Sequence, residues 1–228
     1  MPLNRTHRHP TQEISMFTVY AFATPNSVKV PIALEEMGLP YTLKSVNVRK
    51  GEQKQADFLA LNANGKVPVL VEADHADNAA PFILTESAAI LIYLAEKTGK
   101  LLPQEPLARA RVFEQLFFHA SGLSPAFGNA GFFKRSSPEP QPIAEERFST
   151  EAGRILGLIE NTLSKQRFIA GNSFSIADIA HFGWLWRRQF PDVTLNNKPS
   201  LSRWYDEIAT RPAVERAIAH TEALIPAT

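Results

Sequence analysis

The sequence contains no cysteine. Disulfide bonds, cysteine-bound metals and a protein thiol acting as a nucleophile or redox centre are therefore excluded. If this chain takes part in sulfur chemistry, a ligand must bring the sulfur. The six histidines show no spacing typical of metal ligands within one element, so we also expect no metal site.

Long apolar runs and an excess of one charge are also missing. No stretch of about 18 apolar residues could span a membrane, and the N-terminus lacks the apolar core of a signal peptide. We therefore expect a soluble, cytoplasmic protein with no membrane partner. The net charge of +1 is not typical of nucleic-acid binding. With 228 residues, 44% of them hydrophobic, the chain can bury one or two cores, and small molecules are the expected ligands.

Residues 1–15 are polar and show neither helix nor strand periodicity, so we expect a mobile N-terminal extension. Between residues 16 and 100, strand-like and helix-like patterns alternate. The expected strands are 17–23, 41–48, 68–71 and 82–84, and the expected helices are 27–37, 56–61 and one from Glu86 to the stop at Gly99. This order predicts a thioredoxin-like α/β domain over residues 16–100, which without cysteine cannot carry out dithiol chemistry.

Residues 101–228 are predicted to form an all-helical domain after a linker at 101–106. Apolar periodicity predicts helices at 107–121 and 145–163, with a glycine- and aromatic-rich loop between them that includes residues 128–133. Two prolines, Pro199 and Pro212, each open a further short helix. Ser175 and Asp178 form a capping-box pattern, to which we assign a structural role and no catalytic one.

A proline stands just before a strand-like run in the stretch Gly65–Leu70. Because proline cannot donate to a central ladder, Pro68 must begin the strand, and the Val67–Pro68 bond is a candidate for the cis isomer. Such a bend would turn the Val67 N–H and C=O outward. These groups could then pair with an extended peptide in an antiparallel manner.

Glu86 and Ser87 stand at the start of the helix that follows. The free N–H groups of a helix N-terminus can hold a ligand carboxylate beside Ser87, while Glu86 can pair with a ligand ammonium. The alternative is that Glu86 and Ser87 only form an ordinary acidic first turn of the helix. For a Glu-Ser pair without other motifs nearby, this is the more common explanation. Together with the Val67 edge, however, the pair describes a site for a short peptide that ends in a free amino acid.

Several motifs now combine into a resemblance that spans residues 16–223. The stretch from Val67 to Leu70, followed by Glu86-Ser87, resembles the glutathione site of the glutathione S-transferase superfamily. The turn Thr24-Pro25-Asn26 and Gln53 resemble the subgroup of bacterial Nu-class transferases and glutathione-dependent disulfide-bond oxidoreductases. The resemblance implies the glutathione transferase fold, glutathione as co-substrate, a role in detoxification or disulfide reduction, and a homodimer.

The resemblance also implies roles for the binding residues. Main-chain groups of Val67, before Pro68, would bind the cysteinyl part of glutathione, and Glu86 with Ser87 would hold the γ-glutamyl end. The glycyl end would be reached by Gln53 and Lys66. The sequence departs from the subgroup at Glu114, Phe118 and His119, in a stretch where a glutamine and tryptophans are usual, and the following residues 128–133 also differ. The resemblance therefore does not define the second substrate.

Thr24 and Asn26 are the candidate catalytic residues. A thiol titrates near about 8.5 and is a weak nucleophile until it is ionised. Side-chain donors at the start of a helix can stabilise the thiolate of bound glutathione. The alternative is that Asn26 only caps the helix and Thr24 only ends a strand.

Two classes of function remain open at this point. The first is an enzyme that transfers the glutathione thiolate to an electrophile or a disulfide, and the second is a non-catalytic glutathione-binding regulatory or interaction protein. The residues Thr24, Asn26 and Gln53 favour the enzyme. Aromatic side chains of the helical domain either line a pocket for the second substrate or form core, and we expect only one or two to touch substrate: Phe117, Phe118, Phe127, Phe132, Phe133, Trp184 and Trp186.

Overall fold

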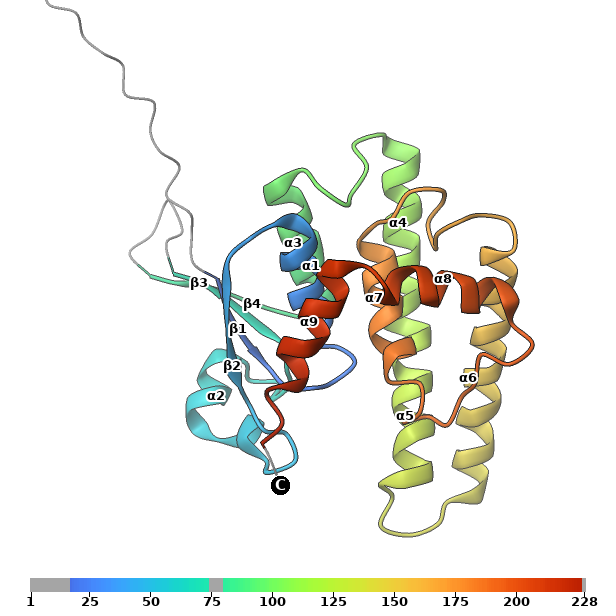
Figure 1. Cartoon of the computed structure of the whole chain (residues 1–228). Helices are drawn as coiled ribbons and strands as arrows, with labels where there is room; N and C mark the ends of the chain where they lie inside the picture. The colour runs from blue at the N-terminus through green and yellow to red at the C-terminus, as the bar shows by residue number, and fades with distance from the viewer. Residues whose placement is uncertain (1–16, 74–79, 227–228) are drawn as a thin grey trace, which may run out of the picture.

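The computed structural model describes residues 17–73 and 80–226. The predicted N-terminal extension at 1–15 lies outside the described residues, as does most of the connection before the last strand. Figure 1 shows a sheet with its helices on one side of the molecule and a group of long helices on the other. The predicted fold class, an α/β thioredoxin-like part followed by an all-helical part, is confirmed.

Four strands form one mixed sheet. They are β1 (Phe17–Ala21), β2 (Tyr41–Ser45), β3 (Val69–Glu72) and β4 (Phe82–Thr85), in the order β2-β1-β3-β4. β1 and β2 are parallel and are joined through helix α1 (Lys29–Met37), as expected for a βαβ unit, whereas β1–β3 and β3–β4 are antiparallel. The predicted 41–48 strand is shorter than expected because the chain leaves the ladder after Ser45.

The two faces of the sheet are covered by different helices. Alternate residues of β1, such as Phe17 and Val19, are buried in the main core together with α1 and α3 (Ser87–Thr98). On the opposite face Val69 packs with Phe58 of α2 (Ala56–Leu61) in a small separate cluster. The period of two in the strand sequences therefore places helices on both sides of the sheet.

The helical part contains α4 (Pro106–Phe118), α5 (Ser124–Arg135), α6 (Pro142–Leu163), α7 (Ile176–Trp186), α8 (Pro199–Ala209) and α9 (Pro212–Glu222). Proline occupies the first turn of α4, α6, α8 and α9, where its missing N–H costs nothing. The helices that Pro199 and Pro212 were predicted to open are both present.

The prediction of a glycine-rich loop between the first two helices of this part is wrong. Residues 124–135 form α5, which continues from α4 through the single π-helical turn η2 (His119–Leu123). The glycines serve close packing rather than a turn. A Cβ on Gly131 would lie 2.2 Å from the ring of Phe190, and one on Gly128 would touch Trp184. Tertiary packing thus overrides the low helix propensity of glycine.

Helix α7 joins the two parts. All of its residues from Ile176 to Leu185 are buried, and it contacts both α1 and α3 beneath the sheet as well as α4. Figure 1 shows α7 on the side of the helical group that faces α1. A Cβ on Gly183 of this helix would lie 2.2 Å from the carbonyl oxygen of Pro25, so α7 directly supports the turn that follows β1.

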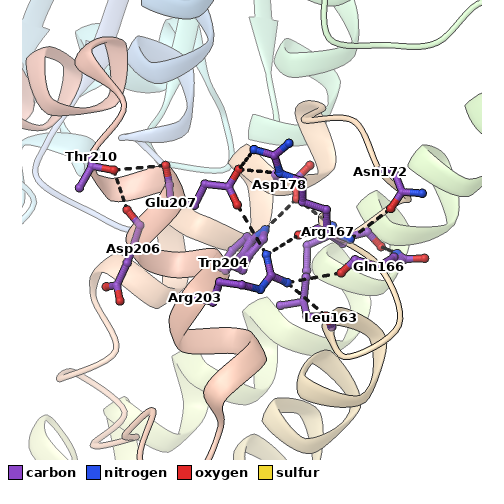
Figure 2. A network of polar contacts seen from close by, with 11 residues as sticks. Leu163, Gln166, Arg167, Asn172, Asp178, Arg203, Trp204, Asp206, Glu207 and Thr210 are labelled. Carbon is purple, nitrogen blue, oxygen red and sulfur yellow. Dashed lines mark hydrogen bonds and ion pairs between the residues drawn. The ribbon is translucent and has the colours of Figure 1, made fainter.

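The predicted capping box at the start of α7 is present. Ser175 Oγ accepts from the backbone of the first turn, and the Asp178 carboxylate accepts from the Ser175 backbone N–H. Asp178 Oδ1 also accepts from Ile169 N at 2.8 Å and from Trp204 Nε1 at 2.8 Å. Figure 2 shows Trp204 of α8 pointing to Asp178, so this carboxylate links α7, α8 and the preceding loop.

Candidate active site

Each of the four strands has one end at the same edge of the sheet, and the candidate residues lie next to these ends. β1 and β2 run parallel and reach this edge at Ala21 and Ser45. β3 begins there, because Tyr20 pairs with Val69, and β4 ends there, because Val69 pairs with Thr85. The segments just beyond these ends contain every residue that the sequence assigned to the candidate site.

The turn after β1 holds Thr24 and Asn26 in defined positions. Thr24 Oγ1 donates to Ser27 Oγ at 2.9 Å and accepts from the Ser27 backbone N–H at 3.2 Å. α1 begins only after Val28 and has no side-chain cap. Asn26 therefore does not cap this helix, which removes the simpler structural explanation for its presence.

A lysine that sequence analysis assigned no role lies beneath this turn. Lys29 is fully buried, and its Nζ donates to Asn26 Oδ1 at 2.7 Å. The same Nζ lies 2.7 Å from Nε2 of His119, which stands 90 positions further along the chain. The sequence offered only one signal for this contact, namely a lysine inside an otherwise apolar helix face.

Burial dominates the electrostatics of this cluster. It lowers the pKa of Lys29 well below its ordinary value, while the Glu86 carboxylate acts in the opposite direction. Burial also lowers the pKa of His119, and the positive charge of Lys29 lowers it further. His181 of α7 has its pKa lowered to about 4, mainly by burial. Both imidazoles are therefore neutral near pH 7.

The Val67–Pro68 peptide bond is cis, in agreement with the expectation from sequence. The Lys66 carbonyl before it accepts from Asn62 Nδ2 at 2.7 Å, which anchors the approach to the bend. Within residues 17–73 and 80–226, nothing hydrogen bonds to the backbone N–H or C=O of Val67. These two groups are thus available to an extended ligand.

Glu86 and Ser87 lie beside this bend at the N-terminus of α3. Glu86 has φ 64°, a left-handed conformation that is uncommon for a residue other than glycine and that often marks a ligand-binding position. Its side chain is exposed, whereas Ser87 is only 9% exposed. No side chain caps α3, so its first N–H groups remain open to an anion.

Gln53 and Lys66 approach the same edge from two further segments. Gln53 lies in the 3₁₀ turn η1 (Glu52–Lys54), and a Cβ on Gly65 would lie 3.2 Å from its backbone oxygen. The buried Oε1 of Gln53 has no hydrogen-bond partner among the described residues. An unpaired buried amide oxygen is costly, and a ligand N–H would satisfy it.

A cavity of about 580 Å³ opens beside the Thr24 turn, between the sheet part and the helical part. Its apolar walls include Phe22, Trp184, Trp186 and Phe190. Two of the seven aromatic residues proposed from sequence, Trp184 and Trp186, are among them, while Phe127 is fully buried in the core. A volume of this size suits a small organic molecule or a short peptide.

Three arginines, Arg49, Arg135 and Arg187, line this cavity, and no acidic side chain of the described residues does. Arg135 and Arg187 each have an acidic ion-pair partner outside the cavity. Burial lowers the pKa of the Arg187 guanidinium; Glu222 opposes this effect and the like charge of Arg49 adds to it. Arg187 is half-buried, with its guanidinium over the ring of Trp186. Sequence reasoning missed this cluster because its members come from three distant segments.

Metal binding, membrane-spanning helices and other hollows were also considered for the described residues. Among residues 17–73 and 80–226, no group of three or more His, Asp or Glu side chains is arranged to hold a metal ion. Within the same residues, no helix is both long and apolar enough to cross a membrane. A second hollow of about 690 Å³ lies between α1, β2 and α9, but none of the candidate residues lines it.

Comparison with known relatives gives the family. Residues 23–97 match the glutathione S-transferase N-terminal domain, and residues 123–212 match the C-terminal domain. The disulfide-bond oxidoreductase YfcG of Escherichia coli is 37% identical over 205 residues, covering 89% of this chain and 94% of its own length. YghU, a second disulfide-bond oxidoreductase of that organism, is 33% identical, covering 94% and 80%.

Solved structures agree with this assignment. A glutathione transferase from Burkholderia graminis, with two glutathione molecules bound per subunit, superposes with a TM-score of 0.83 at 35% identity and covers 92% of this chain and 90% of its own. A glutathione transferase from Pseudomonas putida, with one glutathione disulfide bound per subunit, gives 0.83 at 32% identity and covers 92% and 93%. The chain therefore belongs to the glutathione S-transferase family.

Proposed function

We propose that this protein binds glutathione at the sheet edge and transfers its thiolate to a second substrate, with disulfides as the main class. The observation that carries the proposal is the convergence of the Asn26 turn, the free Val67 backbone and the Glu86-Ser87 helix end on one edge, next to an arginine-lined cavity. The relatives named as disulfide-bond oxidoreductases support it.

The bound tripeptide would lie with its backbone antiparallel to Val67 and its γ-glutamyl group at Glu86 and Ser87. Glu86 pairs with the ligand ammonium, and the ligand carboxylate meets Ser87 and the open N–H groups of α3. Gln53 and Lys66 reach the glycyl end, where the unpaired Gln53 Oε1 accepts a hydrogen bond from a ligand amide. This arrangement places the cysteinyl sulfur toward Thr24 and Asn26.

The chemistry takes place between ligand sulfurs, because the chain has no cysteine. The glutathione thiolate attacks one sulfur of a bound disulfide, a new S–S bond forms, and the old one breaks with its electron pair leaving on the other sulfur as a thiolate. With a mixed glutathione disulfide, the products are glutathione disulfide and one free thiol. Overall, two glutathione molecules are oxidised while one disulfide is reduced to two thiols. The protein contributes orientation and thiolate stabilisation.

The charge of the cavity favours an acidic second substrate. Arg49 and Arg187 carry like charges that repel each other in a partly buried space, and a bound carboxylate relieves this repulsion. A mixed disulfide that contains glutathione has such carboxylates, while Trp184 and Trp186 accommodate its apolar portion. We therefore expect disulfides of this kind to react better than neutral aromatic electrophiles.

Substitution of the helix-end pair tests the binding site. We expect Glu86→Ala and Ser87→Ala each to weaken glutathione binding about tenfold or more, because each removes a hydrogen bond to a charged group of the ligand. Isothermal titration calorimetry measures the effect. Glu114→Ala and Ser164→Ala, at exposed positions on α4 and at the end of α6, are the matched controls and should bind normally. Unchanged affinity in both site variants would remove Glu86 and Ser87 from the site.

Several broader expectations from sequence belong to the same proposal. We propose a homodimer in which the sheet part of one subunit packs on the helical part of its partner, and a division of the chain into domains near Lys100. Membership of the Nu class, a role in detoxification and a cytoplasmic location are proposed on the same resemblance. The relatives that carry the disulfide-bond oxidoreductase name support the subgroup.

A further inference from the structure

Lys29 is an unusual feature of the site, because a lysine is rarely buried without a charged partner. It is 0% exposed, and it forms no ion pair with any residue in the described parts of the chain. Burying an ammonium in this way costs free energy that ordinary packing would not repay. We therefore ask which groups the two hydrogen bonds of Lys29 Nζ hold in place.

The first hydrogen bond fixes the orientation of the Asn26 amide. Lys29 Nζ donates to the Asn26 amide at 2.7 Å, so the amide atom that it contacts is the oxygen. The Asn26 Nδ2 group then lies in the same plane on the other side of the amide carbon, away from the Lys29 contact. Nδ2 has no hydrogen-bond partner among the described residues. It is also not one of the buried polar atoms that lack a partner, so it is accessible from outside. The amide thus presents N–H donors outward from the turn.

The second hydrogen bond fixes Lys29 itself. His119 Nε2 lies 2.7 Å from Nζ, and its other ring nitrogen, Nδ1, is buried and has no partner in residues 17–73 and 80–226. The stem of Lys29 packs against α7, where a Cβ on Gly183 would lie 2.9 Å from Lys29 Cε. The Asn26 turn, η2 and α7 therefore leave Lys29 little freedom to move.

The charged and titratable groups around Lys29 are few. Glu86 acts on it from the N-terminus of α3, and His119 and His181 face it from η2 and α7. At the far end of α1, Glu36 and Glu35 are occupied by ion pairs with Arg211 and Arg216 next to and on α9. Among the described residues, Lys29 therefore faces the Asn26 turn, the two histidines and the Glu86 carboxylate.

We propose that Lys29 is a positioning residue for catalysis: it holds the Asn26 amide with its Nδ2 toward the glutathione sulfur and strengthens this donor by its own hydrogen bond to Oδ1. Hydrogen bonds in a chain polarise one another, so a donor on Oδ1 makes the Nδ2–H groups better donors. A better donor stabilises the thiolate relative to the thiol. This inference rests on the proposed function, in which the glutathione sulfur faces Asn26.

The test measures the pKa of the thiol of bound glutathione, which does not depend on turnover. Thiolate absorbance near about 240 nm is followed against pH with saturating glutathione, for wild type and Lys29→Met. We expect the pKa of the bound thiol to rise by about one unit in the variant, because the Asn26 amide is no longer held in place and its N–H groups become weaker donors to the thiolate. An unchanged pKa of the bound thiol would overturn the proposal.

A kinetic cycle then asks whether Lys29 acts through Asn26. In the wild-type background, Lys29→Met should lower kcat about tenfold with little change in the glutathione KM. In an Asn26→Ala background, the same substitution should lower kcat less than about twofold, since the group it positions is gone. Equal losses in both backgrounds would show that Lys29 acts independently of Asn26 and would contradict the proposal.

Matched variants separate positioning from folding. Lys97→Met removes a lysine of α3 that pairs with Glu72 at 2.8 Å, away from the cavity, and should leave the thiol pKa unchanged. If Lys29→Met does not fold, His119→Leu removes the acceptor that holds Lys29, while His119→Gln retains one. We expect a raised thiol pKa in the first and a normal value in the second. Equal values in both would contradict the proposal, whereas wild type that binds no glutathione would refute the proposed function instead.

Discussion

Replacement of Asn26 by alanine is expected to lower the kcat for disulfide reduction about 100-fold, which is typical for the loss of one donor to a developing or ionised group in an active site. The reason is that Asn26 Nδ2 is the accessible donor of a turn whose orientation is fixed by Lys29. Glutathione affinity should change much less, because Val67, Glu86 and Ser87 provide most of the binding. Steady-state kinetics and calorimetry on the same preparation measure both quantities.

The control for this experiment is Asn161→Ala, at an exposed position on α6 far along the chain from the site. It should have wild-type kcat and affinity. Two outcomes would contradict the role of Asn26. One is an unchanged kcat, and the other is a loss of affinity as large as the loss of kcat, which would make Asn26 a binding residue only.

Replacement of Asp178 by alanine is expected to have the largest effect on stability, lowering the free energy of unfolding by about 3–4 kcal/mol. The Asp178 carboxylate is fully buried and accepts from Ile169 N, Ser175 N and Trp204 Nε1. Its removal leaves these three donors buried without a partner and leaves a small cavity. Denaturant unfolding at a fixed protomer concentration measures the change.

Asp206→Ala is the matched control, because Asp206 is exposed on α8 and its carboxylate makes none of these bonds. Figure 2 shows Asp206 pointing away from the Asp178–Trp204 contact. The control should change the free energy of unfolding by less than about 0.5 kcal/mol. Glutathione affinity of the folded fraction of Asp178→Ala should be normal, so a stable Asp178→Ala protein that has lost glutathione binding would contradict the structural assignment.

Local signals explain which elements could be predicted from the sequence. The strands were visible as apolar segments with a period of two, and Pro199 and Pro212 marked helix starts because their missing N–H suits a first turn. The capping box of Ser175 and Asp178 lies within four residues, so it could be identified without a structure. Helix α5 could not be predicted in this way, because Gly128 and Gly131 are needed for close contact with residues more than 50 positions away.

The candidate site likewise contains residues that local patterns identify and residues that only the folded structure brings together. Residues such as Val67, Glu86 and Ser87 could be named because a proline before a strand and a carboxylate at a helix start are local patterns. The contact of Lys29 with His119 spans 90 positions, and the cavity gathers Arg49, Arg135 and Arg187 from three segments. Contacts of this kind depend on how α4 to α7 pack on the sheet, and a single sequence contains no local signal for that packing.

On the proposed function, a chain without cysteine reduces disulfides with the thiolate of bound glutathione. The measurement that tests it most directly compares two reactions of the wild-type protein at one pH: glutathione-dependent reduction of 2-hydroxyethyl disulfide, which proceeds through a mixed glutathione disulfide, and conjugation of glutathione to an aromatic halide. We predict that kcat/KM for disulfide reduction is at least as large as that for conjugation. Dominant conjugation would contradict the claim, as would glutathione binding without turnover of either substrate, which would favour a non-catalytic binding protein.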